Sequence, residues 1–155
     1  MDKLLAELED YFEYRDVKSN TVSKVDVIWH LYHSLKTINV ICEGLLRSNP
    51  KDYKSKINFV RIFVLTTGII PRGKAKAPKF VIPPSYVETN ELYELLSEAK
   101  NNLKKIEPLA ANANCGHPYF DMINKAQAKK FLRIHTKHHI KIIKDILREH
   151  SLKRF

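Results

Sequence analysis

Residues 131–143 read FLRIHTKHHIKII and place three of the seven histidines of the chain inside an apolar helical pattern. The apolar residues recur every three or four positions over 125–149, which predicts one long amphipathic helix there. His135 and His139 are four residues apart, so on a helix they lie one above the other on the same face. Two imidazoles in this arrangement can reach a single metal ion. Metal binding is therefore the first hypothesis for this segment.

Apolar stripes of the same period predict four more helices along the chain. They cover residues 2–14, 24–48, 53–67 and 91–107. Ser23 is the expected N-cap of the second of these helices, and Thr89 or Asn90 is the expected N-cap of the fourth. In the helix over 53–67, the residues expected to face the core are Ile57, Val60, Phe63 and Val64.

The connections between these helices indicate the fold class, an all-α four-helix bundle. Residues 69–87 show no helical pattern, and a connection of this length is usually functional or a crossover. A long crossover allows two consecutive helices of a bundle to run parallel. We expect the four longer helices to form the bundle, with the helix over 2–14 as an extra short N-terminal element. Residues 108–121 are expected to be irregular.

The composition limits the class of protein. With 155 residues and 44% hydrophobic residues, the chain is long enough for one globular domain, taken as residues 1–155. No apolar run approaches the ~18 residues of a membrane span, and the first residues lack the pattern of a signal peptide, so no membrane partner is expected. Cys42 and Cys115 show neither disulfide-framework nor metal-binding spacing, which favours a reducing, cytoplasmic location.

The net charge of +10 is typical of proteins that bind nucleic acid or other anionic surfaces. The basic residues are spread along the solvated faces of the predicted helices, and no nucleic-acid motif is present. A basic nucleic-acid-binding protein is therefore the second hypothesis. A bundle without catalytic activity that serves only as an interaction domain is the third, because a fold alone does not establish a function.

His30 and His33, on the helix predicted over 24–48, are the candidates for a third metal ligand. At ~100° per residue, His30 lies about 110° from the centre of the apolar stripe and His33 about 170°. His30 then borders the core and is the preferred ligand, whereas His33 points away and is the alternate. Three histidine ligands with open coordination positions are typical of a catalytic metal site rather than a structural one.

Two other histidines lie close to this candidate site in the sequence. His138 is an alternate ligand, because its helical angle does not place it clearly outside the core. His117, which precedes Pro118, is a candidate fourth ligand, substrate contact or staple of its own loop. A hydrogen-bonded core pair without metal is the alternative explanation for His135 and His139, since an unsatisfied buried imidazole costs about 1–3 kcal/mol.

Three stretches taken together resemble the DinB/YfiT-like superfamily. They are SKVDVIWHLYHSL at 23–35, PRGKAKAPK at 71–79, and HPYF at 117–120 followed by HTKHH at 135–139. The most similar branch contains uncharacterised domains whose last helix reads HxxHH. The resemblance covers nearly the whole chain and leaves residues 1–20 outside it as an N-terminal extension. The chain departs from the pattern at Asp121, where a glycine is common, and at Ile142, where a glutamine is common.

The resemblance implies a bundle with up-down-down-up topology and a divalent metal, zinc or nickel, held by His30, His135 and His139. It also implies a small-molecule substrate and a homodimer. Some members of the superfamily are transferases that use a low-molecular-weight thiol, so the expected activity is that of a metal-dependent thiol- or small-group transferase, or of a hydrolase. Arg72 and Lys74 on the long connection are candidates for steering an anionic substrate or thiol towards the metal.

Overall fold

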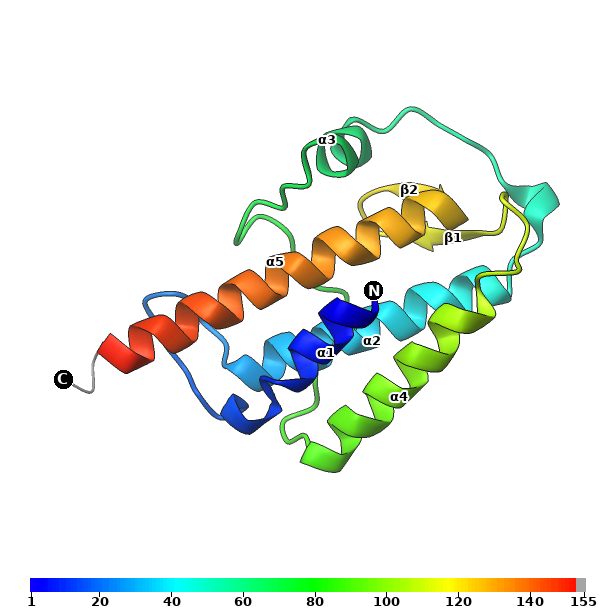
Figure 1. Cartoon of the computed structure of the whole chain (residues 1–155). Coiled ribbons are helices and arrows are strands. Elements are labelled where there is room, and N and C mark those ends of the chain that lie inside the picture. The colour runs from blue at the N-terminus through cyan, green and yellow to red at the C-terminus, as the bar shows by residue number, and fades with distance from the viewer. Residues whose placement is uncertain (153–155) are drawn as a thin grey trace.

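The computed structural model describes residues 1–152 of the chain, and these residues are mostly helical (Figure 1). The α-helices are α1 (Asp2–Glu9), α2 (Val27–Leu46), α3 (Phe59–Thr67), α4 (Thr89–Lys105) and α5 (Lys125–Leu152). Two short strands, β1 (Asn114–His117) and β2 (Asp121–Asn124), precede α5. The predicted all-α class is confirmed at this level. No helix within residues 1–152 has both the length and the apolar character needed to cross a bilayer.

The long helix α2 contacts both α4 and α5, and α1 contacts α4 and α5 as well (Figure 1). The colour ramp of Figure 1 shows that α2 and α4 run in the same direction and that α5 runs in the opposite direction. The connection from the end of α2 to the start of α4 must therefore travel back along the helices. The short helix α3 and the 3₁₀ turn Lys79–Val81 both lie in this crossover.

One hydrophobic core joins α1 to the longer helices. Leu5 and Leu8 of α1 are fully buried, and Phe12 in the 3₁₀ turn that follows is only 3% exposed. Burying a leucine side chain stabilises a fold by about 1.5–3 kcal/mol. The segment expected to be an extra N-terminal element thus packs into the same core as α2, α4 and α5.

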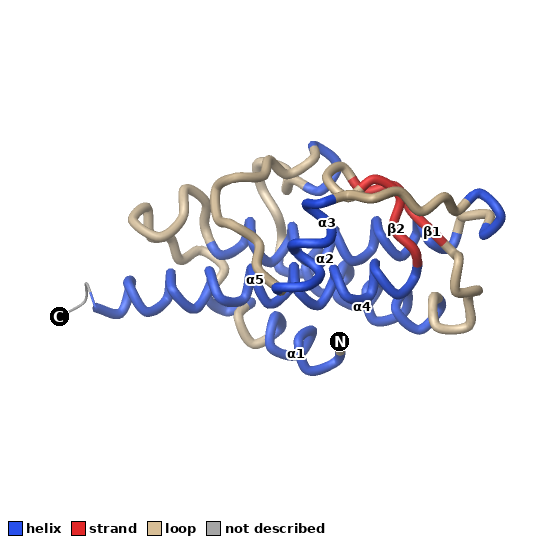
Figure 2. The backbone as a smooth tube through the Cα atoms, turned by 90° about the horizontal axis from the view of Figure 1, so that it is seen from above, coloured by secondary structure: helices blue, strands red, loops and turns tan. Residues whose placement is uncertain are grey.

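Helix α3 lies across the long helices rather than along them, as the two views in Figures 1 and 2 show. It begins at Phe59, six residues later than the predicted start at 53, because the side chain of Asn58 caps it by accepting a hydrogen bond from the Arg61 amide at 2.8 Å. The predicted core stripe of this helix is wrong at three of its four positions, which are exposed. These are Ile57 at 80%, Val60 at 54% and Phe63 at 48%.

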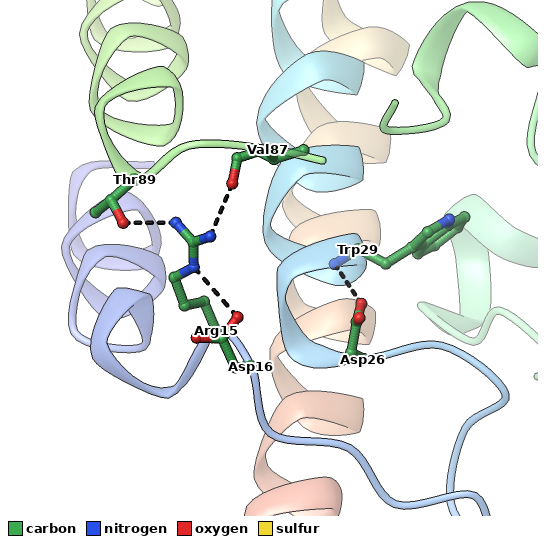
Figure 3. Close-up of polar contacts among 6 residues, drawn as sticks. All are labelled: Arg15, Asp16, Asp26, Trp29, Val87 and Thr89. Atoms are coloured by element: carbon green, nitrogen blue, oxygen red, sulfur yellow. Dashed lines mark hydrogen bonds and ion pairs between the residues drawn. The ribbon is translucent and has the colours of Figure 1, made fainter. Parts of the chain in front are cut away.

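The start of α2 is set by Asp26 rather than by Ser23. The Asp26 carboxylate accepts a hydrogen bond from the Trp29 amide at 3.1 Å, which is the usual N-cap contact (Figure 3). Ser23 instead faces His30, as described below. The entry to α4 is held differently, because Glu88 occupies its N-cap position without a side-chain hydrogen bond. Thr89 and Asn90, the expected caps, are the first two residues of that helix.

Arg15 fixes the start of α4 to the segment that follows α1. Its guanidinium donates to the Val87 carbonyl at 2.8 Å and to the Thr89 hydroxyl, and it pairs with Asp16 (Figure 3). The side chain is only 15% exposed. One cation therefore satisfies polar groups at the end of the crossover, where helix α4 has no side-chain cap of its own.

A β-hairpin replaces part of the stretch predicted to be irregular over 108–121. Strands β1 and β2 pair antiparallel, with Cys115 opposite Ile123. Asp121 begins β2 with a φ of 58°, in the left-handed region that favours glycine. Aspartate is one of the few non-glycine residue types that adopt this region with some frequency, which allows the tight turn between the two strands.

Candidate metal centre

The facing sides of α2 and α5 bring four buried histidines together. His30 and His33 come from α2, and His135 and His139 come from α5; each is at most 8% exposed. Residues three or four apart on a helix lie on neighbouring turns of one face, so each helix supplies a pair. The predicted burial of the α5 pair is confirmed by these exposures.

Three of these imidazoles converge through their Nε2 atoms. The Nε2 atoms of His33 and His139 each lie 3.2 Å from the Nε2 atom of His135. Ligand atoms of the three residues all lie within 4.8 Å of one another. Nitrogen atoms bound tetrahedrally to zinc at about 2.0–2.1 Å are separated by about 3.3 Å. The three histidines are therefore close enough to bind one metal ion.

The protonation of His33 is fixed by the crossover. Its Nδ1 lies 3.0 Å from the Val81 carbonyl oxygen, in the 3₁₀ turn that covers this side of α2. A carbonyl can only accept, so Nδ1 carries the proton and Nε2 keeps its lone pair. Metal-binding histidines commonly donate their other N–H to a backbone carbonyl in this way. The expectation that His33 points away from the core is wrong, because this side chain is 6% exposed and faces the cluster.

His30 is 4% exposed and makes its hydrogen bonds outside the set of three converging Nε2 atoms. Its Nδ1 lies 2.9 Å from Nδ1 of His139, and its Nε2 lies 3.0 Å from the Ser23 hydroxyl. Both nitrogens of His30 are thus engaged outside the set of three converging Nε2 atoms. The hydrogen bond to His139 fixes the ring orientation of that residue, which is the geometry of a group that orients a ligand.

The hydrogen bonds available to the cluster leave one nitrogen contact unsatisfied. A neutral imidazole carries a single N–H, and that of His33 is already donated to Val81. If Nε2 of His135 is protonated, its hydrogen can point to His33 or to His139, but not to both. If Nε2 of His139 is protonated instead, two lone pairs face each other between His33 and His135. The proton of His135 then sits on Nδ1, a buried atom without a hydrogen-bond partner.

Burial keeps these imidazoles neutral. Loss of solvation lowers the pKa of His30 to about 3 and lowers the pKa of His33. The pKa values of His135 and His139 fall well below 6.5 for the same reason, with neighbouring histidines adding to the effect. Neutral imidazole is the form that binds a metal, so the lone pairs are available at neutral pH.

Aromatic rings line the cluster on two sides. Trp29 stacks on His33, with the ring centroids 4.7 Å apart and an interplanar angle of 23°. Phe131, one turn before His135 on α5, has its ring centroid 5.2 Å from that imidazole. These contacts restrict the ring orientations and keep the local environment apolar, which strengthens any charge interaction made there.

His138, an alternate ligand in the sequence analysis, lies beside the cluster rather than in it. Its ring meets His139 edge-on at 5.1 Å, and burial together with the charge of Arg72 lowers its pKa to about 4. Arg72 reaches this end of α5 from the crossover and forms an ion pair of 2.7 Å with Asp145. Lys74, the other residue considered for substrate steering, is exposed.

His117 serves as a staple of the hairpin. Its ring stacks on Phe120, with a centroid distance of 4.2 Å, and meets Phe131 edge-on at 4.5 Å. Its Nδ1 accepts a hydrogen bond from the Tyr119 amide at 3.2 Å. Burial lowers its pKa to about 4. Phe131 is a shared ring neighbour of His117 and His135, and the contacts of His117 within its own hairpin agree with the loop-staple alternative.

Ser23 and Val81 are partners of the histidines that the sequence pattern does not reveal. Ser23 lies seven residues before His30, and a serine preceding a helix is more simply interpreted as a cap. Val81 contributes only its backbone carbonyl, which carries no residue-specific pattern. Comparisons of the chain with protein-family models, with curated proteins and with solved structures find no match.

Proposed function

We propose that this protein is a divalent-metal-dependent enzyme of the DinB/YfiT-like superfamily, with His33, His135 and His139 as the metal ligands. The observation that carries the proposal is the convergence of the three Nε2 atoms. Nε2 of His135 contacts Nε2 of both His33 and His139, but a single hydrogen is present to serve these two contacts. A bound cation would accept the three lone pairs and remove the conflict among the Nε2 atoms, with the proton of His135 then on Nδ1. His33 thus replaces His30 as the proposed third ligand.

The donor set supports a catalytic rather than a structural site. Three neutral imidazoles suit zinc or nickel and leave coordination positions open for water or substrate. When bound, such a metal lowers the pKa of a coordinated water or thiol and so provides a nucleophile at neutral pH. We infer a transferase that uses a low-molecular-weight thiol or another small nucleophile, with a hydrolase as the other reaction of this chemistry.

Residues of the chain would prepare the site for this chemistry. His30, held by the Ser23 hydroxyl, orients His139 through the contact between their Nδ1 atoms. The Val81 carbonyl holds His33 in the required tautomer. The indole of Trp29 excludes water from one face of His33, which favours charge interactions at the metal.

We further propose that α1, α2, α4 and α5 form the four-helix bundle of this superfamily. Figure 1 shows α1 running opposite to α2, so the four helices in chain order would have the up-down-down-up topology. The crossover then joins α2 to α4 and includes α3, which differs from the assignment of bundle helices made from the sequence.

Metal content tests the proposal directly. Protein purified without a histidine tag is analysed by plasma mass spectrometry, before and after reconstitution with zinc, nickel or manganese. We expect close to one ion per chain in the wild type and loss of that ion in His135→Gln. His150→Gln, on the same helix but outside the cluster, is the matched control and should keep the ion. A wild-type protein that binds none of the three metals would refute the proposal.

The enzymatic part of the proposal has its own test. Metal-loaded wild type is assayed with electrophiles in the presence of small thiols, and His135→Gln is assayed in parallel. We expect thiol-dependent product formation that the variant does not support. A metal-loaded protein that consumes neither thiol nor ester substrates would leave metal binding in place but contradict the assigned reaction class.

A further inference from the structure

Helix α3 presents its apolar side to solvent and its single charge to the protein. Arg61 is 5% exposed, and its guanidinium donates to the carbonyls of Phe120 at 3.0 Å and Met122 at 2.9 Å, and to that of Lys56. Val64 is the buried apolar residue of this helix. The usual arrangement of a surface helix, with apolar residues inward and charges outward, is thus reversed.

The outward side of α3, together with Ile57 before it and Ile69 after it, carries six exposed large apolar side chains. Phe59 is 81% exposed and Ile57 is 80% exposed, which is close to full solvent contact. The others are Val60 at 54%, Ile62 at 49%, Phe63 at 48% and Ile69 at 56%. Isolated exposed apolar residues are normal on a protein surface, but a contiguous group of large ones marks a binding surface. We call these six residues the α3 apolar face.

Lysines flank the N-terminal end of the α3 apolar face. Lys54 and Lys56 lie five and three residues before the first residue of the helix, and both are exposed. Lys76 is brought to the same place by Tyr119, whose hydroxyl accepts from the Lys76 amide at 2.8 Å and donates to its carbonyl at 2.9 Å. The Tyr119 carbonyl in turn accepts from Asn58, the N-cap of α3, at 3.2 Å.

The surroundings of the α3 apolar face are rich in basic residues, and Arg72 is the one of them that pairs with a carboxylate, Asp145, within residues 1–152. From Tyr53 to Val87 the sequence contains seven basic residues and no aspartate or glutamate. Among the ion pairs found within residues 1–152, none involves Lys54, Lys56 or Lys76. The nearby Asp121 carboxylate accepts a hydrogen bond from Asn58 at 2.8 Å. The surface therefore combines exposed apolar side chains with free positive charge.

This combination selects among possible partners. A second copy of the chain would place the same uncompensated cations against each other, which is unfavourable. Nucleic acid would satisfy the lysines, but it offers no apolar surface for Ile57, Val60 and Ile62. An anionic bilayer offers both, with phosphate and carboxylate groups at the surface and acyl chains beneath them.

We propose that the α3 apolar face, with Lys54, Lys56 and Lys76, is a peripheral docking surface for anionic lipid membranes. Phe59 and Ile57 enter the boundary between headgroups and acyl chains, while the lysines contact the headgroups. This mode of binding needs no spanning helix. Helix α3 lies at the upper edge of the molecule in Figure 1, on the side opposite to α4.

Vesicle binding tests the charge contribution. Full-length protein is sedimented with vesicles of phosphatidylcholine alone or of phosphatidylcholine with phosphatidylserine, at low and at physiological salt. We expect binding only to the anionic vesicles, weakened by salt. Each lysine near such a surface contributes about fivefold in affinity, so Lys54→Gln with Lys56→Gln should lower it about 25-fold. Lys104→Gln with Lys105→Gln on α4, the same change in net charge, should have little effect.

The apolar contribution is tested by Phe59→Ser, which we expect to lower vesicle affinity at least tenfold. Leu152→Ser is the matched control, because Leu152 is 69% exposed at the other end of the molecule. The exposure of Phe59 means that the substitution should leave the melting temperature unchanged, which separates loss of binding from loss of folding.

Several outcomes would overturn the proposal. Failure of the wild type to bind anionic vesicles at low salt would overturn it. A loss of affinity in the control variants as large as that in the test variants would also overturn it. Light scattering that shows a dimer dissolved by Phe59→Ser, without vesicle binding, would assign the α3 apolar face to a second copy. Binding to single-stranded nucleic acid that survives Phe59→Ser, again without vesicle binding, would assign the lysines to that partner.

Discussion

Replacing His30 and His33 separately by leucine would distinguish a group that orients a ligand from a ligand. The two residues lie one turn apart on α2 and are both buried, so the same replacement makes a similar change of volume at each site. His33→Leu removes one of three proposed metal-binding nitrogens. His30→Leu removes no proposed metal-binding nitrogen, but it removes the contact of 2.9 Å to Nδ1 of His139 and the contact of 3.0 Å to the Ser23 hydroxyl. The two variants should therefore differ strongly in metal affinity.

The expected losses of metal affinity follow from the role that each histidine has in the cluster. Structural zinc sites with four ligands have binding free energies of about 10–16 kcal/mol, which is about 3 kcal/mol per ligand. Loss of one ligand in His33→Leu should therefore lower the zinc affinity more than a hundredfold. Loss of a group that orients a metal-binding histidine costs about 10–100-fold, and we expect His30→Leu near the lower end, because leucine keeps the packing against Trp29 and removes only hydrogen bonds. Competition with a chromophoric chelator measures both affinities.

Counting the imidazole ligands gives the stricter test. X-ray absorption fine structure on the zinc-loaded proteins should show three histidine ligands in the wild type and in His30→Leu, but two in His33→Leu. A count of two in His30→Leu together with three in His33→Leu would refute the assignment and restore His30 as the third ligand. Circular dichroism of the metal-free variants checks that α2 is still folded.

Three further predictions concern stability. Arg61→Met should lower the free energy of unfolding in urea by about 3 kcal/mol, because three backbone carbonyls lose their donor. Arg47→Met, at the exposed C-cap of α2, should cost less than about 0.5 kcal/mol. Leu8→Ala should cost about 2–5 kcal/mol if α1 belongs to the core, and a change below 1 kcal/mol would contradict that. The pKa of His117 is lowered to about 4, so between about pH 6.5 and 4 the unfolded chain binds more protons at this residue than the folded chain does. The stability of the metal-free protein should therefore fall as the pH is lowered through this range, and His117→Phe should remove about 3 kcal/mol of that loss in pH-dependent melts.

Much of the fold could be predicted from periodicity, and the exceptions have local causes. The stripes of α2, α4 and α5 are regular because each helix buries a face in one core. Helix α3 has the same kind of stripe but is held by Arg61 and Val64, so its other apolar residues stay outside. A stripe shows that a face is apolar but not which partner covers it. The β-hairpin was missed because strands of four residues are too short to show alternation.

The two halves of the candidate site differ in how well the sequence predicts them. The pair on α5 follows from a spacing of four residues within a strong pattern, and the structure buries both residues. The position of His33 was predicted wrongly because α2 is buried around most of its circumference. It contacts α4 and α5, and the 3₁₀ turn Lys79–Val81 covers a further side. A helix enclosed in this way has no solvent-facing side from which an angle can be measured.

The crossover therefore determines which histidine faces the cluster. Without the Val81 carbonyl, Nδ1 of His33 would need a water molecule as its hydrogen-bond acceptor. No protein group would then hold the ring with Nε2 directed towards His135. The crossover contributes no metal-binding side chain, yet it fixes the tautomer of one proposed ligand and brings Arg72 to Asp145 on α5. Substitutions in residues 78–82 should then alter metal affinity without touching a histidine, since they shift the carbonyl that His33 requires. The long connection is in this respect part of the site, which is consistent with the general rule that long ordered connections carry function.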